Sequence, residues 1–286
     1  MGKTIAIVGA GRVGRALGTR LRELGWSVGA VVTRSEGTAR KAVRAIGGGQ
    51  AHAGSTRQVV GADVILIATP DSAIERVAQS LAKIGGNEWR GRIVLHTSGA
   101  LDRSALAALG KRGAAIGSIH PLQTFSGAAI PNLDGAVFGV EGDRKAQGMA
   151  RRIARELGGV PVRLESRDKA AYHAAGAFAS GLVLALVEAA TRMLTARGFQ
   201  RKRALQAVLG LTRQTLENLE RTGARAAWTG PIARGDFSTV ARHAAALRRL
   251  SAEHRAAYAA VSRLAAAVLA RNPRQTRRQL DKVLRG

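Results

Sequence analysis

The chain has 286 residues, 46% of them apolar, which suffices for two ordinary domains with hydrophobic cores. It contains no cysteine, which excludes disulfides, thiolate metal sites and cysteine nucleophiles. We recognise no leader peptide after Met1 and no apolar run near the ~20 residues of a membrane span, so we expect a cytoplasmic protein outside any membrane.

The net charge of +26 comes mainly from arginine, because only 8 of the 45 basic residues are lysine. These arginines are spread along the whole chain, and aromatic residues make up only 3% of it. Nucleic-acid binders gather their charge on one face, and single-strand binders add aromatic stacking platforms. We interpret the charge mainly as exposed surface and expect no nucleic-acid partner. Binding of acidic or phosphorylated ligands is the alternative.

The first ~165 residues alternate short apolar runs, which predict strands, with amphipathic patterns, which predict helices. This alternation predicts crossover connections and a mainly parallel sheet, and therefore an α/β domain over residues 1–165. A glycine turn at 47–49 precedes one further weak strand. We expect the other strands at 4–8, 27–33, 63–68, 92–96, 114–119, 136–140 and 160–164, and helices at 12–24, 37–46, 72–83, 103–109 and 144–157.

After residue 165 the strand patterns stop, and nearly every segment has helical periodicity. This predicts an all-helical domain over residues 166–286. The segment TGPIARGD, residues 229–236, interrupts the helices with glycine and proline turns. We expect the helices at 167–197, 201–221, 237–249, 252–269 and 273–284.

The first predicted strand runs directly into GAGRVG, residues 9–14, and then into a helix. In dinucleotide-binding folds such glycines have separate tasks: Gly9 permits a tight turn, Gly11 lets a pyrophosphate approach the backbone, and Gly14 lets helix and strand pack closely. The free N–H groups of the helix start attract the anion. We predict that Gly9, Gly11, Arg12, Val13 and Gly14 bind a dinucleotide.

The end of the second strand distinguishes the two nicotinamide cofactors. An NAD site usually has an acidic residue there, whereas this chain has Thr33, Arg34 and Ser35. A guanidinium and two hydroxyls suit the 2′-phosphate of NADP(H), so we predict NADP(H) rather than NAD(H). The alternative is that Arg34 is an ordinary surface arginine and Ser35 caps the next helix.

Ligands of open α/β sheets bind beyond the carboxyl ends of the strands. The strand at 63–68 ends at Ala68, and Thr69 and Pro70 follow it. We predict that these three residues contact the dinucleotide. Asp71 is equally consistent with an N-cap of the next helix.

The strand at 114–119 is followed directly by His120 and Pro121. Histidine exchanges protons near neutral pH, so at this edge of the sheet we predict that His120 is a general acid or base. Gln123 and Thr124 follow and are predicted to orient a substrate. His96 lies inside its strand, and we predict a structural role for it. No metal site is predicted.

Lys169 and His173 are four residues apart on a predicted helix and therefore share one face. We predict that this face meets the substrate; the alternative is an exposed lysine and a hydrogen-bonded structural histidine. In the irregular segment, Arg234 is a candidate clamp for an anionic substrate. Asp236 is consistent with an N-cap of the helix that follows.

Six motifs together resemble the Rossmann-like proteins with a C-terminal domain of unknown function, the DUF2520 group. That group is similar to the NADP reductases related to 6-phosphogluconate dehydrogenase, among them ketopantoate reductase, pyrroline-carboxylate reductase, imine reductases and prephenate dehydrogenase. The resemblance implies NADP(H) at the strand ends, a substrate cleft between the domains and a homodimer formed through the helical domain. The motifs are GAGRVG (9–14), TRS (33–35), TSGAL (97–101), HPLQTF (120–125), DKAAYHAAGAFAS (168–180) and GPIARGD (230–236).

The resemblance also implies particular catalytic residues. Prephenate dehydrogenases have a catalytic His-Pro after a strand; SIHP, ending in His120-Pro121, is similar, with Ser98 placed on the neighbouring strand. Hydroxyacid and ketopantoate enzymes carry a Lys-x-x-x-Asn pair, which reads Lys169 and His173 here. Gly181 stands where an asparagine is expected.

These patterns favour an NADP(H)-dependent oxidoreductase that transfers a hydride to or from a small carbonyl, hydroxyacid or imine substrate, with an anionic substrate as one option. Its catalytic residues would be His120, Lys169, His173 and Ser98. The alternative function is nucleotide binding or sensing without turnover, in which the helical domain serves as an interaction surface.

Overall fold

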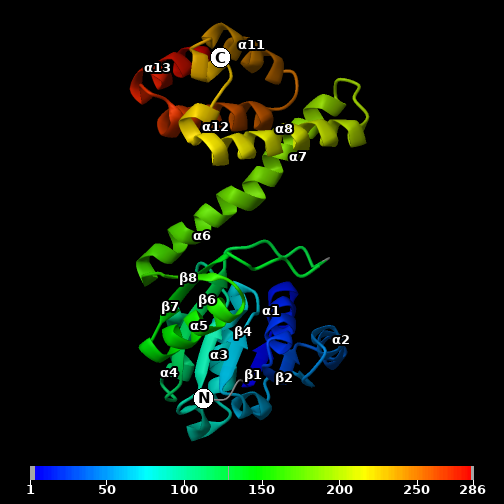
Figure 1. Ribbon diagram of the computed structural model, residues 1–286, viewed down its shortest axis with the longest axis vertical. Helices are drawn as coiled ribbons and strands as arrows, with labels where there is room; N and C mark the ends of the chain where they lie inside the picture. The colour runs from blue at the N-terminus through cyan, green and yellow to red at the C-terminus, as the bar shows by residue number, and fades with distance from the viewer. Residues whose placement is uncertain (1–3, 128, 285–286) are drawn as a thin grey trace. The chain divides into compact units, whose positions relative to one another are not determined.

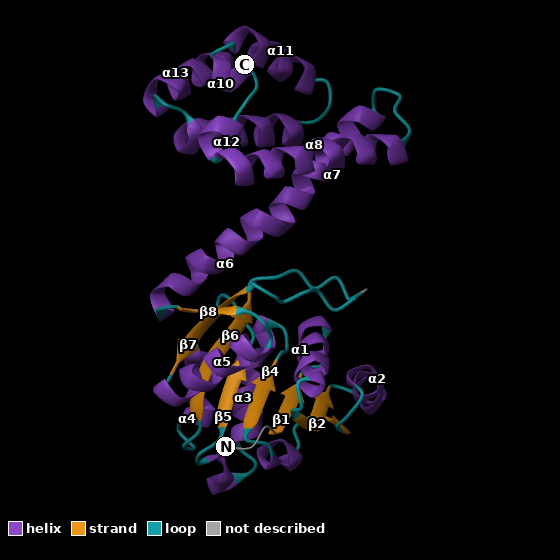
Figure 2. Cartoon of the chain, viewed as in Figure 1, coloured by secondary structure: helices purple, strands orange, loops and turns teal. Residues whose placement is uncertain are grey.

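The computed structural model describes residues 4–127 and 129–284. The chain divides into two compact units, residues 1–180 and 181–286. Strands occur in unit 1, and the described residues of unit 2 form helices joined by loops (Figure 2). An α/β domain followed by a helical region is the predicted fold class, and the structure confirms it.

Unit 1 is built on one eight-stranded sheet with the order β3-β2-β1-β4-β5-β6-β7-β8 (Figure 1). Neighbouring strands are parallel except for the antiparallel pair β6–β7. The connections put the carboxyl ends of β1, β4, β5 and β6 at one edge of the sheet, where ligands of such folds bind. The strands are β1 (Thr4–Val8), β2 (Ser27–Thr33), β3 (Gln50–Ala53), β4 (Val64–Ile67), β5 (Ile93–His96), β6 (Ala115–Pro121), β7 (Val137–Gly142) and β8 (Val160–Arg163).

The alternation of side chains along each strand gives the sheet two apolar faces. Ile5 and Ile7 of β1 pack on the side of α1 (Arg12–Glu23), α2 (Glu36–Ile46) and α5 (Arg144–Glu156). Ala6 and Val8 pack on the side of α3 (Asp71–Ala82) and α4 (Ala107–Gly110). Short 3₁₀ turns complete the connections: η1 (Arg57–Gly61), η2 (Gly86–Trp89), η3 (Arg103–Leu106) and η4 (Ser166–Asp168).

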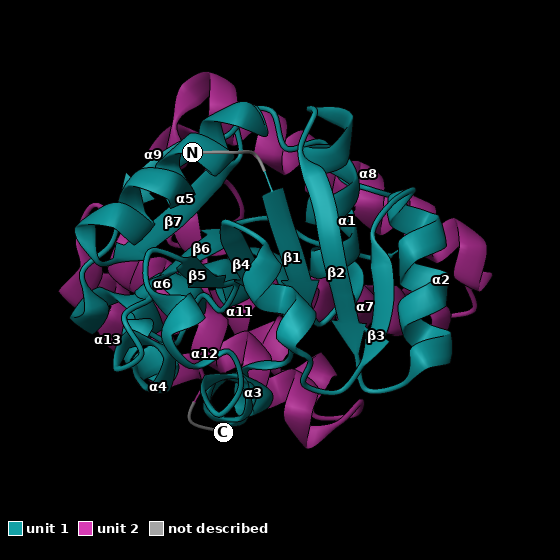
Figure 3. Cartoon of the chain, turned by 90° about the horizontal axis from the view of Figure 1, so that it is seen from below, with its two compact units in different colours: residues 1–180 teal, residues 181–286 magenta. Residues whose placement is uncertain are grey.

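The boundary between the units falls later than the predicted one after residue 165. The strands do end there, at Arg163, but α6 (Lys169–Ala177) packs against the sheet through Lys169 and Tyr172. The division therefore lies within the π-helical turn Phe178–Leu182, between residues 180 and 181 (Figure 3). The predicted single helix 167–197 is thus a 3₁₀ turn, α6, the π-helical turn and α7 (Val183–Thr195).

Unit 2 has a small apolar core in which Val240, Ala266 and Leu280 are fully buried. These residues lie on three helices, so the core ties the C-terminal half of the unit together. Besides α7, the helices are α8 (Arg201–Thr222), α9 (Ala224–Ala227), α10 (Pro231–Arg234), α11 (Phe237–Leu247), α12 (Ala252–Leu269) and α13 (Pro273–Leu284).

One expectation about apolar segments needs correction. The continuous helical segment Ser166–Thr195 contains an 18-residue window with a mean hydropathy of 1.6, which is long and apolar enough to cross a membrane. Only 6% of that window is buried. Alanine, glycine and one histidine dilute its leucine and valine residues, so no obvious apolar run is visible in the sequence. By length and composition alone, this segment meets the criterion of a membrane span.

Candidate cofactor and catalytic site

The glycine turn after β1 has the geometry that a bound pyrophosphate requires. Gly9 has φ of +91°, and a Cβ there would lie 2.6 Å from the backbone nitrogen of Thr69. A Cβ on Gly14 would lie 2.3 Å from the carbonyl oxygen of Gly9. Around Gly11, in contrast, no atom lies within 4 Å of an added Cβ. Two glycines are therefore required by packing, and the third leaves the backbone open to a ligand.

Thr69 provides a second sign that a ligand belongs at this turn. Its Oγ1 is buried and has no hydrogen-bond partner among the described residues. Buried hydroxyls are nearly always hydrogen-bonded in native proteins. Thr69 touches the Gly9 turn, since its Cγ2 would lie 2.7 Å from a Cβ on Gly9. An unpaired hydroxyl beside an open phosphate loop fits a dinucleotide well.

The other residues predicted to contact the cofactor have differing environments. Ala68 donates its N–H to Val8 and is part of the sheet edge, while Pro70 is the N-cap of α3. Arg12 is exposed at the start of α1. Val13 packs partly against the core, which leaves its backbone as the group available to a ligand.

The three residues at the end of β2 differ in whether their side chains are already hydrogen-bonded. Thr33 donates its hydroxyl to the carbonyl of Ser35 at 2.7 Å, and Ser35 caps α2 by accepting the N–H of Thr38. The helix-cap alternative for Ser35 is therefore what the structure shows. Arg34 is exposed and has no carboxylate partner among the described residues. Of the three residues, only Arg34 keeps its full binding capacity for an external phosphate.

His120, at the end of β6, is held by α6. Its Nδ1 lies 3.0 Å from the hydroxyl oxygen of Tyr172, and its ring stands edge-on to His173 at 5.8 Å. Burial lowers the pKa of His120 to about 4, with the charges of His173 and Lys169 adding to the effect. The imidazole is therefore neutral at pH 7.

Gly99, after β5, makes room for both imidazoles. A Cβ there would lie 2.8 Å from Cδ2 of His173 and 2.9 Å from Nε2 of His120. No other residue type would let the two rings approach this loop. The structure thus brings together His120 and His173, two of the predicted catalytic residues, across a glycine that the sequence motif TSGAL contains.

Lys169 is fully buried, whereas a lysine that contacts a substrate directly would be exposed to the ligand site. Its Nζ donates to Ser118 Oγ at 2.7 Å and to the carbonyl of Ser98 at 3.2 Å. Burial lowers the pKa of Lys169 to about 8, while Glu141, Asp102 and Asp71 oppose this shift. Lys169 therefore joins α6 to the ends of β5 and β6 and remains mostly charged at pH 7.

Ser98 is also fully engaged. Its hydroxyl donates to Asp71 Oδ2 at 2.7 Å and accepts the N–H groups of Ala100 and Leu101. His96 is buried, with its ring nitrogens 3.0 Å from the carbonyl of Asp102 and 3.2 Å from the N–H of Ser98. Burial lowers the pKa of His96 to about 4. Both side chains fix the loop after β5.

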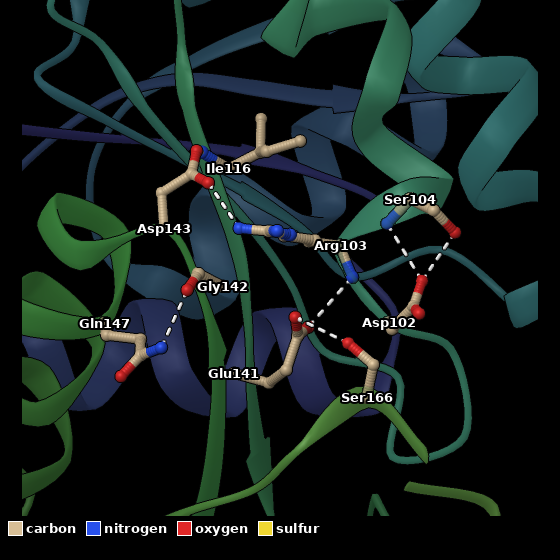
Figure 4. A network of polar contacts seen from close by, with 9 residues as sticks. All are labelled: Asp102, Arg103, Ser104, Ile116, Glu141, Gly142, Asp143, Gln147 and Ser166. Carbon is tan, nitrogen blue, oxygen red and sulfur yellow. Dashed lines mark hydrogen bonds and ion pairs between the residues drawn. The ribbon is translucent and has the colours of Figure 1, made fainter.

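Glu141 of β7 balances the charge of Lys169 from the opposite strand, since it pairs with Ser118 in the β6–β7 register. It accepts the N–H of Arg103 at 2.8 Å and the hydroxyl of Ser166 at 3.3 Å (Figure 4). Burial raises the pKa of Glu141. This network ties the turn before α6 to the loop after β5, and so fixes where α6 begins.

Gln123 and Thr124, predicted to orient a substrate, are exposed and bonded within their own loop. Gln123 donates to the carbonyl of Asn132 at 3.3 Å and accepts the N–H of Thr124 at 2.8 Å. A ligand that binds the amide of Gln123 would have to replace these hydrogen bonds.

Arg234 lies in unit 2, on the rim of a hollow of about 1030 Å³. Two further arginines, Arg225 and Arg271, and the rings of Trp228 and Phe237 line it. The lining contains no acidic residue. Asp236 instead caps α11 by accepting the N–H of Thr239, and this and related hydrogen bonds lower its pKa to about 2.

Sequence reasoning missed four residues of this site: Tyr172, Gly99, Ser118 and Glu141. Ser118 and His120 are two apart on a strand, so they share a face, and Lys169 and Tyr172 are three apart on a helix. These spacings were a usable signal. The pairing of the two faces was not, because it depends on tertiary packing.

Comparisons with known proteins agree with this architecture. A family model described as a Rossmann-like domain matches residues 2–121, and the DUF2520 family model, a domain of unknown function, matches residues 136–265. Among proteins with curated descriptions, none matches this chain.

Solved structures extend the likeness over the whole chain. A candidate NADP oxidoreductase from Bacteroides fragilis has a TM-score of 0.75 at 19% identity, covering 97% of this chain and 98% of its own. A Thermotoga maritima protein has a TM-score of 0.68 at 25% identity, covering 96% and 98%. Pyrroline carboxylate reductase from Plasmodium falciparum, with NADP bound, has 0.60 at 12%, covering 96% and 98%. The two family models thus match most of the chain between them, a Rossmann-like domain first and a DUF2520 domain after it.

Proposed function

We propose that the protein is an NADP(H)-dependent oxidoreductase acting on a small carbonyl, hydroxyacid or imine substrate. The observation that carries this proposal is the sharing of one sheet edge by an open phosphate loop and a neutral histidine. β1 and β6 are three strand spacings apart, roughly 14 Å, a span that an extended dinucleotide covers. The NADP bound to the Plasmodium falciparum reductase, and the NADPH in a reductive aminase from Aspergillus terreus, support the choice of cofactor.

The residues present fit the cofactor in three places. The backbone at Gly11 and the start of α1 would hold the pyrophosphate, and the unpaired hydroxyl of Thr69 would donate to the dinucleotide. Arg34 would bind the 2′-phosphate. When bound, NADP(H) supplies or accepts the hydride.

The protein's own side chains handle the proton and the charge. His120 exchanges the proton with the substrate oxygen or nitrogen, and His173 lies beside it as a second polar contact. Lys169 does not touch the substrate. Its buried ammonium group favours a negatively charged substrate through its positive charge alone. Ser98 keeps Asp71 and the TSGAL loop in place.

A direct test is titration of the purified protein with NADPH and NADH, followed by calorimetry. We expect NADPH to bind more tightly, and Arg34→Ala to reduce NADPH affinity about 10- to 100-fold with little change for NADH, because a charged hydrogen bond contributes about 1.5–3 kcal/mol. Arg44→Ala is the matched control, as Arg44 is exposed on the adjoining helix α2. If neither nucleotide binds, the oxidoreductase proposal fails.

We further propose that the hollow around Arg234 binds an anionic group. Trp26 and Trp89 are buried in unit 1, so iodide quenching of tryptophan fluorescence reports mainly on Trp228. We expect phosphate to compete with iodide, and Arg234→Gln to weaken this competition about 1.5- to 5-fold, a loss typical of one exposed charged contact. Arg213→Gln, on an exposed part of α8, should have no effect. Equal competition in all three proteins would contradict the proposal.

We also propose that a second copy of the chain covers the apolar surface of the helical region. Leu184 of α7 is 68% exposed, and Leu211 of α8 is 73% exposed. Exposed apolar residues in such number on neighbouring helices are typical of an interface. A second copy is favoured over a bilayer because α6, the first part of the apolar segment, packs on the sheet through Lys169 and Tyr172.

Sedimentation equilibrium without detergent tests this interface. We expect a dimer, and a shift to monomer in the double variant Leu184→Glu/Leu211→Glu, because two charges would be buried without partners. Gln206→Glu, at another exposed position on α8, is the control and should remain dimeric. A monomeric wild type would contradict the dimer, and a protein that stays dispersed only in detergent would favour the membrane interpretation.

A further inference from the structure

Tyr172 contacts His120 at two atoms. Its hydroxyl donates to the backbone carbonyl of His120 at 3.3 Å, and its oxygen lies 3.0 Å from Nδ1 of the ring. A hydroxyl has one proton, so a tyrosine that donates to the carbonyl can only accept from Nδ1–H. In a neutral imidazole this leaves Nε2 without a proton.

We propose that Tyr172 is a positioning residue that holds His120 in the Nδ1–H tautomer, so that Nε2 accepts a proton from a substrate hydroxyl. The proposal rests on the proposed oxidoreductase function and assigns to its site a residue and a substrate class.

The backbone of β7 is shaped to receive the tyrosine ring. Gly139 pairs with His120 in the β6–β7 register, and a Cβ on Gly139 would lie 2.9 Å from Cζ of Tyr172 and 3.0 Å from its hydroxyl oxygen. The imidazole and phenol rings meet edge-on at 5.5 Å. Packing against Gly139 therefore fixes the position of the tyrosine ring. If the His120 ring rotated, the Tyr172 hydroxyl could not move with it.

The other ring nitrogen of His120 is not hydrogen-bonded to the described part of the chain. Nε2 faces Gly99, where a Cβ would lie only 2.9 Å away, and this nitrogen has no hydrogen-bond partner within residues 4–127 and 129–284. One ring nitrogen is thus held by the protein, and the other is left for a ligand. This arrangement is the usual one for an imidazole that transfers protons.

Charged neighbours keep the ring neutral. His173 and Lys169 of α6 and His96 of β5 disfavour its protonation, and Asp71 at the start of α3 favours it. Together with burial these groups lower the pKa of His120 to about 4. Near pH 7, the tautomer therefore decides what the ring can do.

A bare Nε2 can accept a proton but cannot donate one. It therefore suits a substrate that enters with a hydroxyl group, such as a hydroxyacid, and not an imine, whose reduction needs a proton donor. Among the three proposed substrate classes, the geometry favours the hydroxyacid, whose hydroxyl can give its proton to Nε2.

The test is the tautomeric state of His120 in the full chain, read by long-range hydrogen–nitrogen correlation spectra of ¹⁵N-labelled protein at pH 7.5. A His120→Asn variant identifies the signals. We expect wild type to carry the proton on Nδ1, and Tyr172→Phe, which keeps the ring on Gly139, to move a large fraction of it to Nε2.

The chain supplies its own control pair. Nδ1 of His243 lies 3.0 Å from the hydroxyl oxygen of Tyr258, and their rings meet edge-on at 5.9 Å. Tyr258→Phe removes the same hydroxyl from the same kind of pair, yet it should leave the His120 signals unchanged.

Two results would overturn the proposal: a wild-type proton on Nε2, or an unchanged tautomer in Tyr172→Phe. The wild-type spectrum decides by itself if the variant does not fold. Neither measurement needs nucleotide or turnover, so failure here is distinct from failure of NADPH binding. On a hydroxyacid substrate we expect Tyr172→Phe to lower kcat/KM about 10- to 100-fold, the usual cost of losing a partner that orients a working imidazole, with NADPH affinity unchanged.

Discussion

Replacement of His120 by asparagine is expected to lower kcat about 10²- to 10⁴-fold, the usual contribution of one positioned proton-transfer group. NADPH affinity should remain within about twofold of wild type, because His120 lies three strand spacings from the glycine turn. The measurement is steady-state turnover with the ketoacids, hydroxyacids and cyclic imines that a screen identifies, together with NADPH calorimetry. His96→Asn is the control for loss of a buried imidazole that is structural.

The pH profile provides a second check on His120. Its pKa is lowered to about 4, so the proton-accepting form persists well below the ordinary histidine range. We expect kcat/KM for oxidation to stay level from pH 7 to about 5 and to fall as the pH approaches 4. A fall centred near 6.5 would show that the working group is not this buried imidazole.

The same lowered pKa affects stability. Between pH 6.5 and 4 the unfolded chain binds the His120 proton and the folded chain does not, so stability falls as the pH falls through this window. In His120→Asn this part of the acid dependence should disappear, and the curve of Tm against pH should be flatter below 6.5.

If turnover in His120→Asn equals that of the wild type, His120 is not the proton-transfer group.

Replacement of Lys169 by methionine is expected to reduce the free energy of unfolding by about 2–4 kcal/mol at pH 7, because it removes two buried hydrogen bonds and leaves their acceptors without partners. Those acceptors are Ser118 Oγ and the carbonyl of Ser98. Urea unfolding followed by circular dichroism measures the change. Lys202→Met, at an exposed position of α8, is the control.

The effect of pH on Lys169 has a definite sign. The folded pKa of about 8 lies below the ordinary value of 10.5, so between these values the unfolded chain holds the proton and the folded chain does not. Stability of the wild type therefore gains from a rise in pH across this window, and the methionine variant lacks that gain. A variant as stable as wild type at pH 7 and at pH 10 would show that Lys169 is not a buried anchor.

The sheet and the glycine turn after β1 were predicted well from the sequence because their signals are local. A tight glycine turn between a strand and a helix can be recognised from neighbouring residues, and so can the arginine after β2. The packing of α6 on the sheet is different. Lysine is usually a surface residue, so the sequence gives no sign that Lys169 is buried. Its burial is explained by Ser118 and Glu141, which pair with each other on the sheet beneath it.

The antiparallel pair β6–β7 also escaped prediction, and it determines how the catalytic side chains meet. β8 runs against β6 and ends at Arg163, which pairs with Val140 of β7, itself the partner of Ile119 in β6. Because Ser118 pairs with His96, the last residue of β5, the chain leaves β8 near the carboxyl ends of β5 and β6, and α6 begins there. Lys169 meets the Ser118 level first, and Tyr172 meets the His120 level one turn later.

The site depends on a match between the length of helix from Lys169 to Tyr172 and the length of strand from Ser118 to His120. Three residues of helix advance about 4.5 Å and two residues of strand about 6.6 Å, and the lengths of the side chains take up the difference. One residue inserted between Lys169 and Tyr172 would turn the tyrosine by about 100° around the helix and away from His120. Insertions before Ser166 or beyond Ala177 would leave that pairing intact. Insertions and deletions are therefore expected to be tolerated least between Lys169 and Tyr172, because each of these residues pairs with a fixed position on β6.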